Sequence, residues 1–244
     1  MTASVRRVVV LCIVIVRAAA LEPGARDPTV PGSMELFLPG PAGRLEAALW
    51  MPAKHSVPRA AAVMCHPHPL FGGTMRTNAL FRAARGLQQA GLAVLRFNFR
   101  GVEKSAGVHH GQGGEVDDLG AALDWMEERF PGLELWAGGF SFGARTSAER
   151  ATRDARIARV VLVAMPVLRF DCWFLRELRV PGLVLMAGKD EFGNLAQLRE
   201  RYPGLDPSIE LDEIPDVGHF FEGMTQEVTA RVQLWAERQL ELRA

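Results

Sequence analysis

The stretch Gly139-Phe140-Ser141-Phe142-Gly143 is the motif from which the fold of this chain can be interpreted. It follows an apolar run that begins at Leu133, and it precedes a run of helical character from Ala144 to Ala155. Strand, tight turn and helix form the setting in which the serine of a G-x-S-x-G motif projects from a sheet as a nucleophile. Glycine is expected two residues to either side of Ser141, because a larger side chain there would clash with neighbouring backbone. The Phe142 amide would then point to the place where negative charge develops on a substrate.

The composition indicates one domain with a substantial core. The chain has 244 residues, 48% of them apolar, and its 28 acidic and 28 basic side chains give a formal net charge of zero. Nucleic-acid-binding proteins usually carry a basic excess, so this balance argues against that class. Three widely spaced cysteines, Cys12, Cys65 and Cys172, show neither zinc-ligand spacing nor a disulfide framework. We therefore expect buried thiols in a reducing compartment.

The N-terminal segment has two interpretations. Arg6 and Arg7 precede an apolar run from Val8 to Val16, which is too short to span a bilayer, so no stable membrane insertion is expected. The run resembles the core of a secretory signal, which implies export to the periplasm or the medium. Alternatively, the functional chain begins near Met34 and the protein is cytoplasmic. Residues 1–33 are read as signal-like or poorly structured, and one domain is expected over residues 34–244.

Strands alternate with helices from residue 34 onward. Seven runs rich in apolar residues predict strands over residues 34–38, 45–50, 60–65, 92–99, 133–140, 160–165 and 183–187, and the less apolar segment 209–214 predicts an eighth. Apolar residues at helical spacing predict helices over residues 78–90, 116–126, 144–155 and 228–242. This alternation predicts an α/β fold with a doubly wound, mostly parallel, eight-stranded sheet and helices on both faces. Ligands bind at the C-terminal ends of strands in such sheets, so reactive side chains are expected directly after the apolar runs.

Two residues after later strands complete a candidate catalytic group with Ser141. A serine hydroxyl needs a histidine as base, and the histidine needs a carboxylate that fixes its tautomer. The order along a doubly wound chain is serine, acid, histidine. Asp190 closes one apolar run, and His219 is the one histidine that follows Ser141 in the sequence. Glu191 is the fallback acid. The alternatives are that Asp190 caps a helix and that His219 lies in a surface turn.

A candidate oxyanion hole needs two backbone amides. One belongs to Phe142, and the second is expected from the loop that contains His66-Pro67-His68-Pro69. Proline has no N–H, which leaves the amide of His68 or of Leu70. Leu70 is slightly favoured, because Phe71-Gly72-Gly73 lets the backbone turn in closely.

The H-x-H pair of His66 and His68 is also a possible start of a metal site. No carboxylate or third histidine stands nearby at ligand spacing. Neither a metal nor another cofactor is expected. Cys65 ends an apolar strand and is expected to be a small core residue rather than a nucleophile.

Five stretches of the chain carry a family resemblance. They are Cys65 to Met75, Leu95 to Gly101, Gly139 to Gly143, Gly188 to Phe192 and His219 to Phe221. Together they are similar to the α/β-hydrolases, and more narrowly to small bacterial serine hydrolases related to dienelactone hydrolase and the X-prolyl dipeptidase-like esterases. The resemblance implies the same triad of Ser141, Asp190 and His219. One position departs from the family pattern, because Glu103 stands where a second glycine usually follows Arg-Gly.

The segment from Val167 to Pro181 leaves room for only one short helix, so a minimal lid or none is expected. Phe170, Trp173 and Phe174 in this segment are candidates to line a substrate pocket, with core packing as the alternative. Phe71 and Glu103 are further candidate substrate-binding residues.

The expected activity is hydrolysis of small or short-acyl carboxylic esters through an acyl-enzyme on Ser141. The expected partner is thus a small-molecule ester. Alternative functions are those of a peptidase, thioesterase or acyltransferase with the same triad, or of a non-catalytic binding protein with this fold.

Overall fold

The computed structural model describes residues 33–52, 57–111 and 113–242. The interpretation of residues 1–32 as signal-like or poorly structured lies outside the described residues. The first strand begins at Ser33, one residue before the expected start of the domain.

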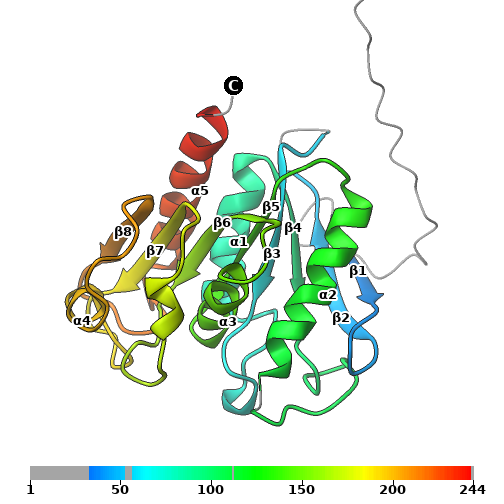
Figure 1. Cartoon of the computed structure of the whole chain (residues 1–244), viewed down its shortest axis with the longest axis horizontal. Coiled ribbons are helices and arrows are strands. Elements are labelled where there is room, and N and C mark those ends of the chain that lie inside the picture. The colour runs from blue at the N-terminus through cyan, green and yellow to red at the C-terminus, as the bar shows by residue number, and fades with distance from the viewer. Residues whose placement is uncertain (1–32, 53–56, 112, 243–244) are drawn as a thin grey trace, which may run out of the picture.

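An eight-stranded sheet runs through the centre of the protein in the order β1-β2-β4-β3-β5-β6-β7-β8 (Figure 1). The strands are β1 (Ser33–Leu38), β2 (Leu45–Trp50), β3 (Ala60–Cys65), β4 (Leu92–Phe97), β5 (Leu135–Phe140), β6 (Ile157–Val163), β7 (Gly182–Ala187) and β8 (Ile209–Ile214). β2 is antiparallel to both β1 and β4, and every other pair is parallel. The predicted fold class is therefore confirmed. Because β3 to β8 are parallel, the loops after them gather at one edge of the sheet.

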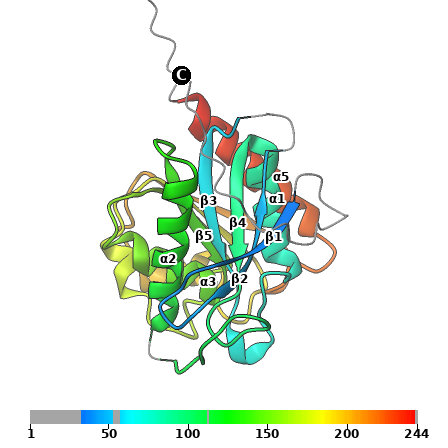
Figure 2. The same ribbon diagram turned by 90° about the vertical axis from the view of Figure 1, so that its right-hand side faces the viewer.

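Helices cover both faces of the sheet. α1 (Asn78–Ala90) and α5 (Thr225–Glu241) pack on one face, and α2 (Gly114–Arg129) and α3 (Phe142–Ala151) pack on the other (Figures 1 and 2). A short helix, α4 (Leu195–Arg201), precedes β8, and two 3₁₀ helices complete the set, η1 (Pro69–Phe71) and η2 (Trp173–Arg176). α4 begins with a capping box, in which Asn194 and Gln197 exchange side-chain to backbone hydrogen bonds.

The apolar core lies in two layers, one on each face of the sheet. Every residue of β3 is buried, which explains its unbroken apolar run. On the face of α1 and α5, the rings of Trp136 and Trp235 meet with centroids 5.5 Å apart. On the other face, Phe97 and Phe99 pack edge to face at 5.2 Å. The sheet is thus held rigidly on both sides, and the loops at its C-terminal edge are positioned by it.

Several predicted boundaries differ from the structure by two to four residues, and two of these differences have a clear physical reason. β6 ends at Val163 rather than Met165, because Ala164 adopts a left-handed backbone with φ +51° and Pro166 cannot donate to a strand ladder. The helix α3 ends at Ala151 rather than Ala155. The chain leaves the helix after this residue, and the Asp154 carboxylate accepts hydrogen bonds from Arg150 and Arg156.

No helical lid is inserted between β6 and β7. The connection contains only the one-turn helix η2, as the sequence predicts. Within residues 33–52, 57–111 and 113–242, every helix is too short or too polar to cross a bilayer.

Candidate active site

Ser141 lies in a strained turn between β5 and α3. Its backbone has φ +56° and ψ −117°, a conformation that non-glycine residues rarely adopt. The Ser141 amide donates to the Val163 carbonyl at 2.8 Å, which ties the turn to β6. A Cβ added to Gly139 would lie 2.5 Å from the carbonyl carbon of Gly143. A side chain at either glycine of the motif would therefore collide with backbone.

The structure brings Ser141, Asp190 and His219 together as a hydrogen-bonded chain. His219 Nε2 lies 2.9 Å from Ser141 Oγ, and His219 Nδ1 lies 2.7 Å from Asp190 Oδ2. All three residues are buried. The second carboxylate oxygen of Asp190 accepts a hydrogen bond from the Phe192 amide at 2.8 Å. That bond fixes the carboxylate toward the imidazole, so Asp190 is not merely a helix cap, and the N-cap of α4 is Asn194.

The loops that carry Asp190 and His219 are joined to each other. The Lys189 amide donates to the Val217 carbonyl at 2.9 Å, beside the ends of β7 and β8. The rings of Phe140 and Phe192 pack on the His219 ring, with centroid distances of 4.9 and 4.7 Å. The imidazole is thereby held in one orientation. The fallback acid Glu191 is exposed and is not brought to His219.

Two backbone N–H groups lie free of acceptors near Ser141. Phe142 is the first residue of α3, so its N–H has no acceptor within the helix. The Leu70 N–H, in contrast, donates to Nδ1 of the His68 ring at 3.2 Å. Among the described residues, the His68 N–H has no hydrogen-bond acceptor. Of the two candidate second donors, the Leu70 N–H is thus engaged by the His68 ring, whereas the His68 N–H is available to an acceptor.

His66 links the segments that follow two neighbouring strands, β3 and β4. Its Nε2 accepts from the Phe99 amide at 3.0 Å, and its Nδ1 donates to the Pro67 carbonyl at 2.6 Å. Both ring nitrogens are therefore engaged in hydrogen bonds. Burial lowers the pKa of His66 to about 3, so the ring is neutral. No group of three or more His, Cys, Asp or Glu side chains is arranged for a metal within the described ranges.

Cys65 precedes this histidine at the end of β3. Burial raises the pKa of its thiol to about 12, so the thiolate needed for nucleophilic attack is absent near neutral pH.

Comparisons with known proteins find solved structures that share this fold. The chain matches an α/β serine hydrolase homologue from Coxiella burnetii at 33% identity and a TM-score of 0.76, over 82% of this chain and 95% of that one. It matches a serine hydrolase without a lid from Xanthomonas campestris at 31% identity and a TM-score of 0.74, over 88% and 98% of the two chains. An uncharacterized protein of Rickettsia prowazekii is 33% identical over 208 residues, which is 81% of this chain and 86% of that protein. No model of a known protein family matches the sequence.

The chain belongs to the α/β-hydrolase superfamily. The two solved relatives above are serine hydrolases, which supports a hydrolase activity for this chain.

The aromatic residues that were expected to line a substrate pocket of this hydrolase differ in exposure. Phe174 is fully buried in the core beside α3, so its assignment as a substrate-binding residue is wrong. Its neighbour in η2, Trp173, faces outward and is 51% exposed. Phe71 is 73% exposed and packs beside the His68 ring at 4.9 Å.

Glu103, the residue that departs from the family pattern, adopts a left-handed backbone with φ +48°. Glycine suits that conformation, which explains the usual family residue. The Glu103 carboxylate forms an ion pair with Arg76 and accepts from Asn98 Nδ2 at 3.0 Å. Its negative charge is therefore engaged in bracing the loop, while the side chain itself stays partly exposed.

Two hollows of this hydrolase meet at His109. One has a volume of about 400 Å³ and is lined in part by Leu70, Val102, Glu103 and Val108. The other has a volume of about 360 Å³ and is lined in part by His68, Glu115, Phe142 and Arg145. His109, Glu115 and Arg145 could not be predicted from the sequence, since they come from separate segments and form no motif.

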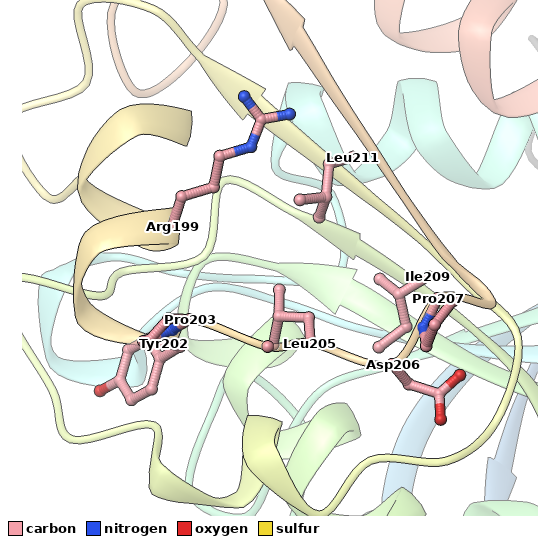
Figure 3. Close-up of a pocket in the computed structure, with 9 residues that line it drawn as sticks. Arg199, Tyr202, Pro203, Leu205, Asp206, Pro207, Ile209 and Leu211 are labelled. Carbon is pink, nitrogen blue, oxygen red and sulfur yellow. The ribbon is translucent and has the colours of Figure 1, made fainter.

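A third hollow, of about 290 Å³, lies beside the edge strand β8 (Figure 3). Arg199 and Asp206 stand at opposite ends of it, with Leu205 and Ile209 between them. The Asp206 carboxylate accepts hydrogen bonds from Ser208. None of the residues that line this hollow is a serine, cysteine or histidine, so the candidate active site stays at Ser141.

Proposed function

We propose that this hydrolase cleaves small or short-acyl carboxylic esters through an acyl-enzyme on Ser141. One observation carries the proposal: the His219 ring is hydrogen-bonded to Ser141 on one side and to Asp190 on the other. That arrangement supplies a base for the hydroxyl and a carboxylate that stabilises the imidazolium formed during the reaction.

In the first half of the proposed reaction, His219 Nε2 takes the proton of Ser141 while Oγ attacks the ester carbonyl carbon. The carbonyl oxygen becomes an oxyanion, which accepts hydrogen bonds from the amides of Phe142 and His68. The N-terminus of α3 adds a favourable dipole at the same place. The intermediate then collapses, the ester C–O bond breaks, and His219 returns the proton to the departing alcohol.

In the second half, water attacks the acyl-enzyme. His219 takes a proton from the water, the oxyanion forms again, and the bond from the acyl carbon to Ser141 Oγ breaks. Ser141 regains its proton from His219 and the carboxylic acid departs. No cofactor takes part in either half of this scheme.

The preference for small esters follows from the surroundings of Ser141. No lid is present to form a large apolar channel, and the two hollows at His109 have volumes of only about 360 and 400 Å³. Pockets of that size suit small ligands.

The substitution Ser141→Ala tests the proposal. With a short-acyl nitrophenyl ester, kcat should fall by about 10⁴-fold or more, because the nucleophile is removed. Ser208→Ala is a matched control on an exposed loop and should leave kcat unchanged. Hydrolysis that persists in the Ser141→Ala protein would contradict the scheme. If the wild-type protein is folded and hydrolyses no ester, amide or thioester, it is a binding protein instead.

A further inference from the structure

The rings of His68 and Phe142 pack against each other. Their centroids lie 4.9 Å apart, and the amides of the same two residues are the proposed oxyanion donors. The His68 ring is also joined to its own loop, because its Nδ1 accepts from the Leu70 amide at 3.2 Å. Burial, and next the neighbouring His109, lower the pKa of His68, so its ring is neutral near neutral pH and Nδ1 can accept. A shift of the His68 ring would therefore move the backbone that carries the second donor.

His109 packs on both of these rings. Its ring centroid lies 5.1 Å from that of His68, with the planes at 78°, and 6.2 Å from that of Phe142, with the planes at 87°. Both are edge-to-face arrangements, a geometry that aromatic pairs favour. The two residues that supply the proposed oxyanion donors therefore share one neighbouring ring.

His109 is itself fixed at two points. Its Nδ1 is hydrogen-bonded to Glu115 Oε1 at 2.5 Å, and the two side chains are only 5% and 2% exposed. Its backbone lies against the turn after β4, since a Cβ added to Gly101 would stand 3.0 Å from His109 N. The ring thus cannot turn away from its aromatic neighbours without breaking a buried hydrogen bond.

Glu115 is held in place by the end of β4. It lies in the first turn of α2, and the Arg100 guanidinium donates to the Gly114 carbonyl at 2.6 Å and to the Asp118 carboxylate at 2.7 Å. Asp118 is fully buried, and hydrogen bonds between charged partners are among the stronger ones. The start of α2 is thereby fastened to the strand beside β3, and β3 is followed by the loop that carries His68.

We propose that His109, held by Glu115, is a positioning residue that sets the spacing of the two oxyanion donors. The inference rests on the proposed esterase function. His109 acts through the rings of His68 and Phe142, and a misplacement of about 1 Å in a catalytic site can cost about 10²-fold in rate. Loss of the His109 ring should therefore weaken the stabilisation of the oxyanion and leave the nucleophile, the base and the acid in place.

Replacement of the carbonyl oxygen by sulfur tests this role, because sulfur accepts hydrogen bonds weakly. The probes are nitrophenyl butanoate and its thiono ester, in which C=S replaces C=O. Each kcat/KM is divided by the rate of alkaline hydrolysis of the same ester, which removes intrinsic reactivity. The oxygen-to-sulfur ratio then measures the contribution of the oxyanion donors, and in wild-type protein it should be about 10²-fold or more. A general loss of active protein lowers both rates equally and leaves the ratio unchanged.

Two variants assign the ratio to the pair. His109→Gln removes the ring, while its amide can still donate to Glu115. Glu115→Ala removes the carboxylate that holds the ring and leaves no unpaired charge buried. Each should lower the oxygen-to-sulfur ratio by about tenfold, which is less than the loss expected when a donor is deleted outright. His110→Ala alters the neighbouring histidine, which is exposed, and should keep the wild-type ratio.

The outcomes separate this inference from the proposed function. A wild-type ratio in folded His109→Gln and Glu115→Ala proteins overturns the positioning role, even if their kcat/KM values are lower. Should only one variant fold, that variant decides. If neither folds, the pair is needed for the fold itself and the inference is likewise overturned. The esterase proposal stands in each of these cases, and it fails if wild-type protein hydrolyses no ester.

Discussion

The carbonyl oxygen of Cys65 lies so close to Gly143 that a Cβ on Gly143 would stand 2.1 Å from it. The end of β3 and the first turn of α3 therefore touch through a residue without a side chain. This contact sets the spacing between the loop that carries His68 and the turn that carries Ser141. The second glycine of the motif is thus needed for the geometry of the whole candidate site.

Gly143→Ala should consequently lower the free energy of unfolding by about 1–3 kcal/mol or more, because backbone has to move. Gly132→Ala is the matched control. Gly132 has a positive φ, +80°, which Gly143 does not, and no atom lies within 4 Å of its added Cβ. Gly132→Ala should lower the free energy of unfolding only by the cost of a left-handed backbone for alanine, about 1–2 kcal/mol. Denaturant titration measures both, and equal losses would contradict the steric argument.

Asp190→Asn should lower kcat by about 10³–10⁴-fold, because an amide nitrogen in place of Oδ2 favours the wrong tautomer of His219. Glu191→Gln removes the neighbouring carboxylate, which is exposed, and should leave kcat unchanged. Steady-state kinetics on one short-acyl ester compares the two variants. A large loss in Glu191→Gln with little loss in Asp190→Asn would show that the acid has been assigned to the wrong residue.

His66 makes stability depend on pH. Its pKa falls from the ordinary value of 6.5 to about 3 in the folded protein, so between these values the unfolded chain binds the extra proton. Stability is therefore lost as the pH falls below about 6.5, by up to about 1.4 kcal/mol per pH unit from this group.

His66→Gln isolates that contribution. A glutamine oxygen can accept from the Phe99 amide in place of Nε2, and it does not titrate. The free energy of unfolding of the variant, measured between pH 5 and 7 by denaturant titration, should depend less steeply on pH than that of the wild type. Identical slopes would mean that His66 is not held neutral in the folded protein.

Glu103 allows backbone strain to be separated from its ion pair. Glu103→Ala removes the pair with Arg76 but keeps a side chain at a left-handed φ, whereas Glu103→Gly removes the strain as well. Glu103→Gly should therefore be more stable than Glu103→Ala by about 1–2 kcal/mol. Thermal or denaturant unfolding of the two variants measures the difference. An Ala variant as stable as the Gly variant would contradict the strain.

The order of strands and helices could be predicted from the sequence because each element has its own local pattern of apolar residues and is bounded by turn-forming residues. Buried parallel strands such as β3 and β7 are unbroken apolar runs, and glycine or proline separates them from the next element. The boundary at β6 was predicted two residues too late, because Ala164 is as apolar as its neighbours. Alanine has no preference for a left-handed backbone, so the sequence does not indicate the conformation that ends the strand.

The candidate site was predictable where chain order limits the choice. His219 is the one histidine after Ser141 in the sequence, and the structure places it between Ser141 and Asp190. Phe174 could not be separated from Trp173 by sequence, since the direction of a side chain in a one-turn helix depends on tertiary packing. The bond from the Leu70 amide to the His68 ring is likewise set by loop geometry. Glu115 on α2 and Arg145 on α3 come to line one hollow only through the packing of α2 against α3.

Covalent labelling of Ser141 tests the central claim most directly. Wild-type protein is treated with a fluorophosphonate, digested, and analysed by peptide mass spectrometry, with esterase activity followed in parallel. Labelling should reach about one equivalent, lie on Ser141, and abolish activity in proportion to its extent. Active, folded protein in which Ser141 stays unlabelled, or in which another residue is labelled as activity disappears, would contradict the account.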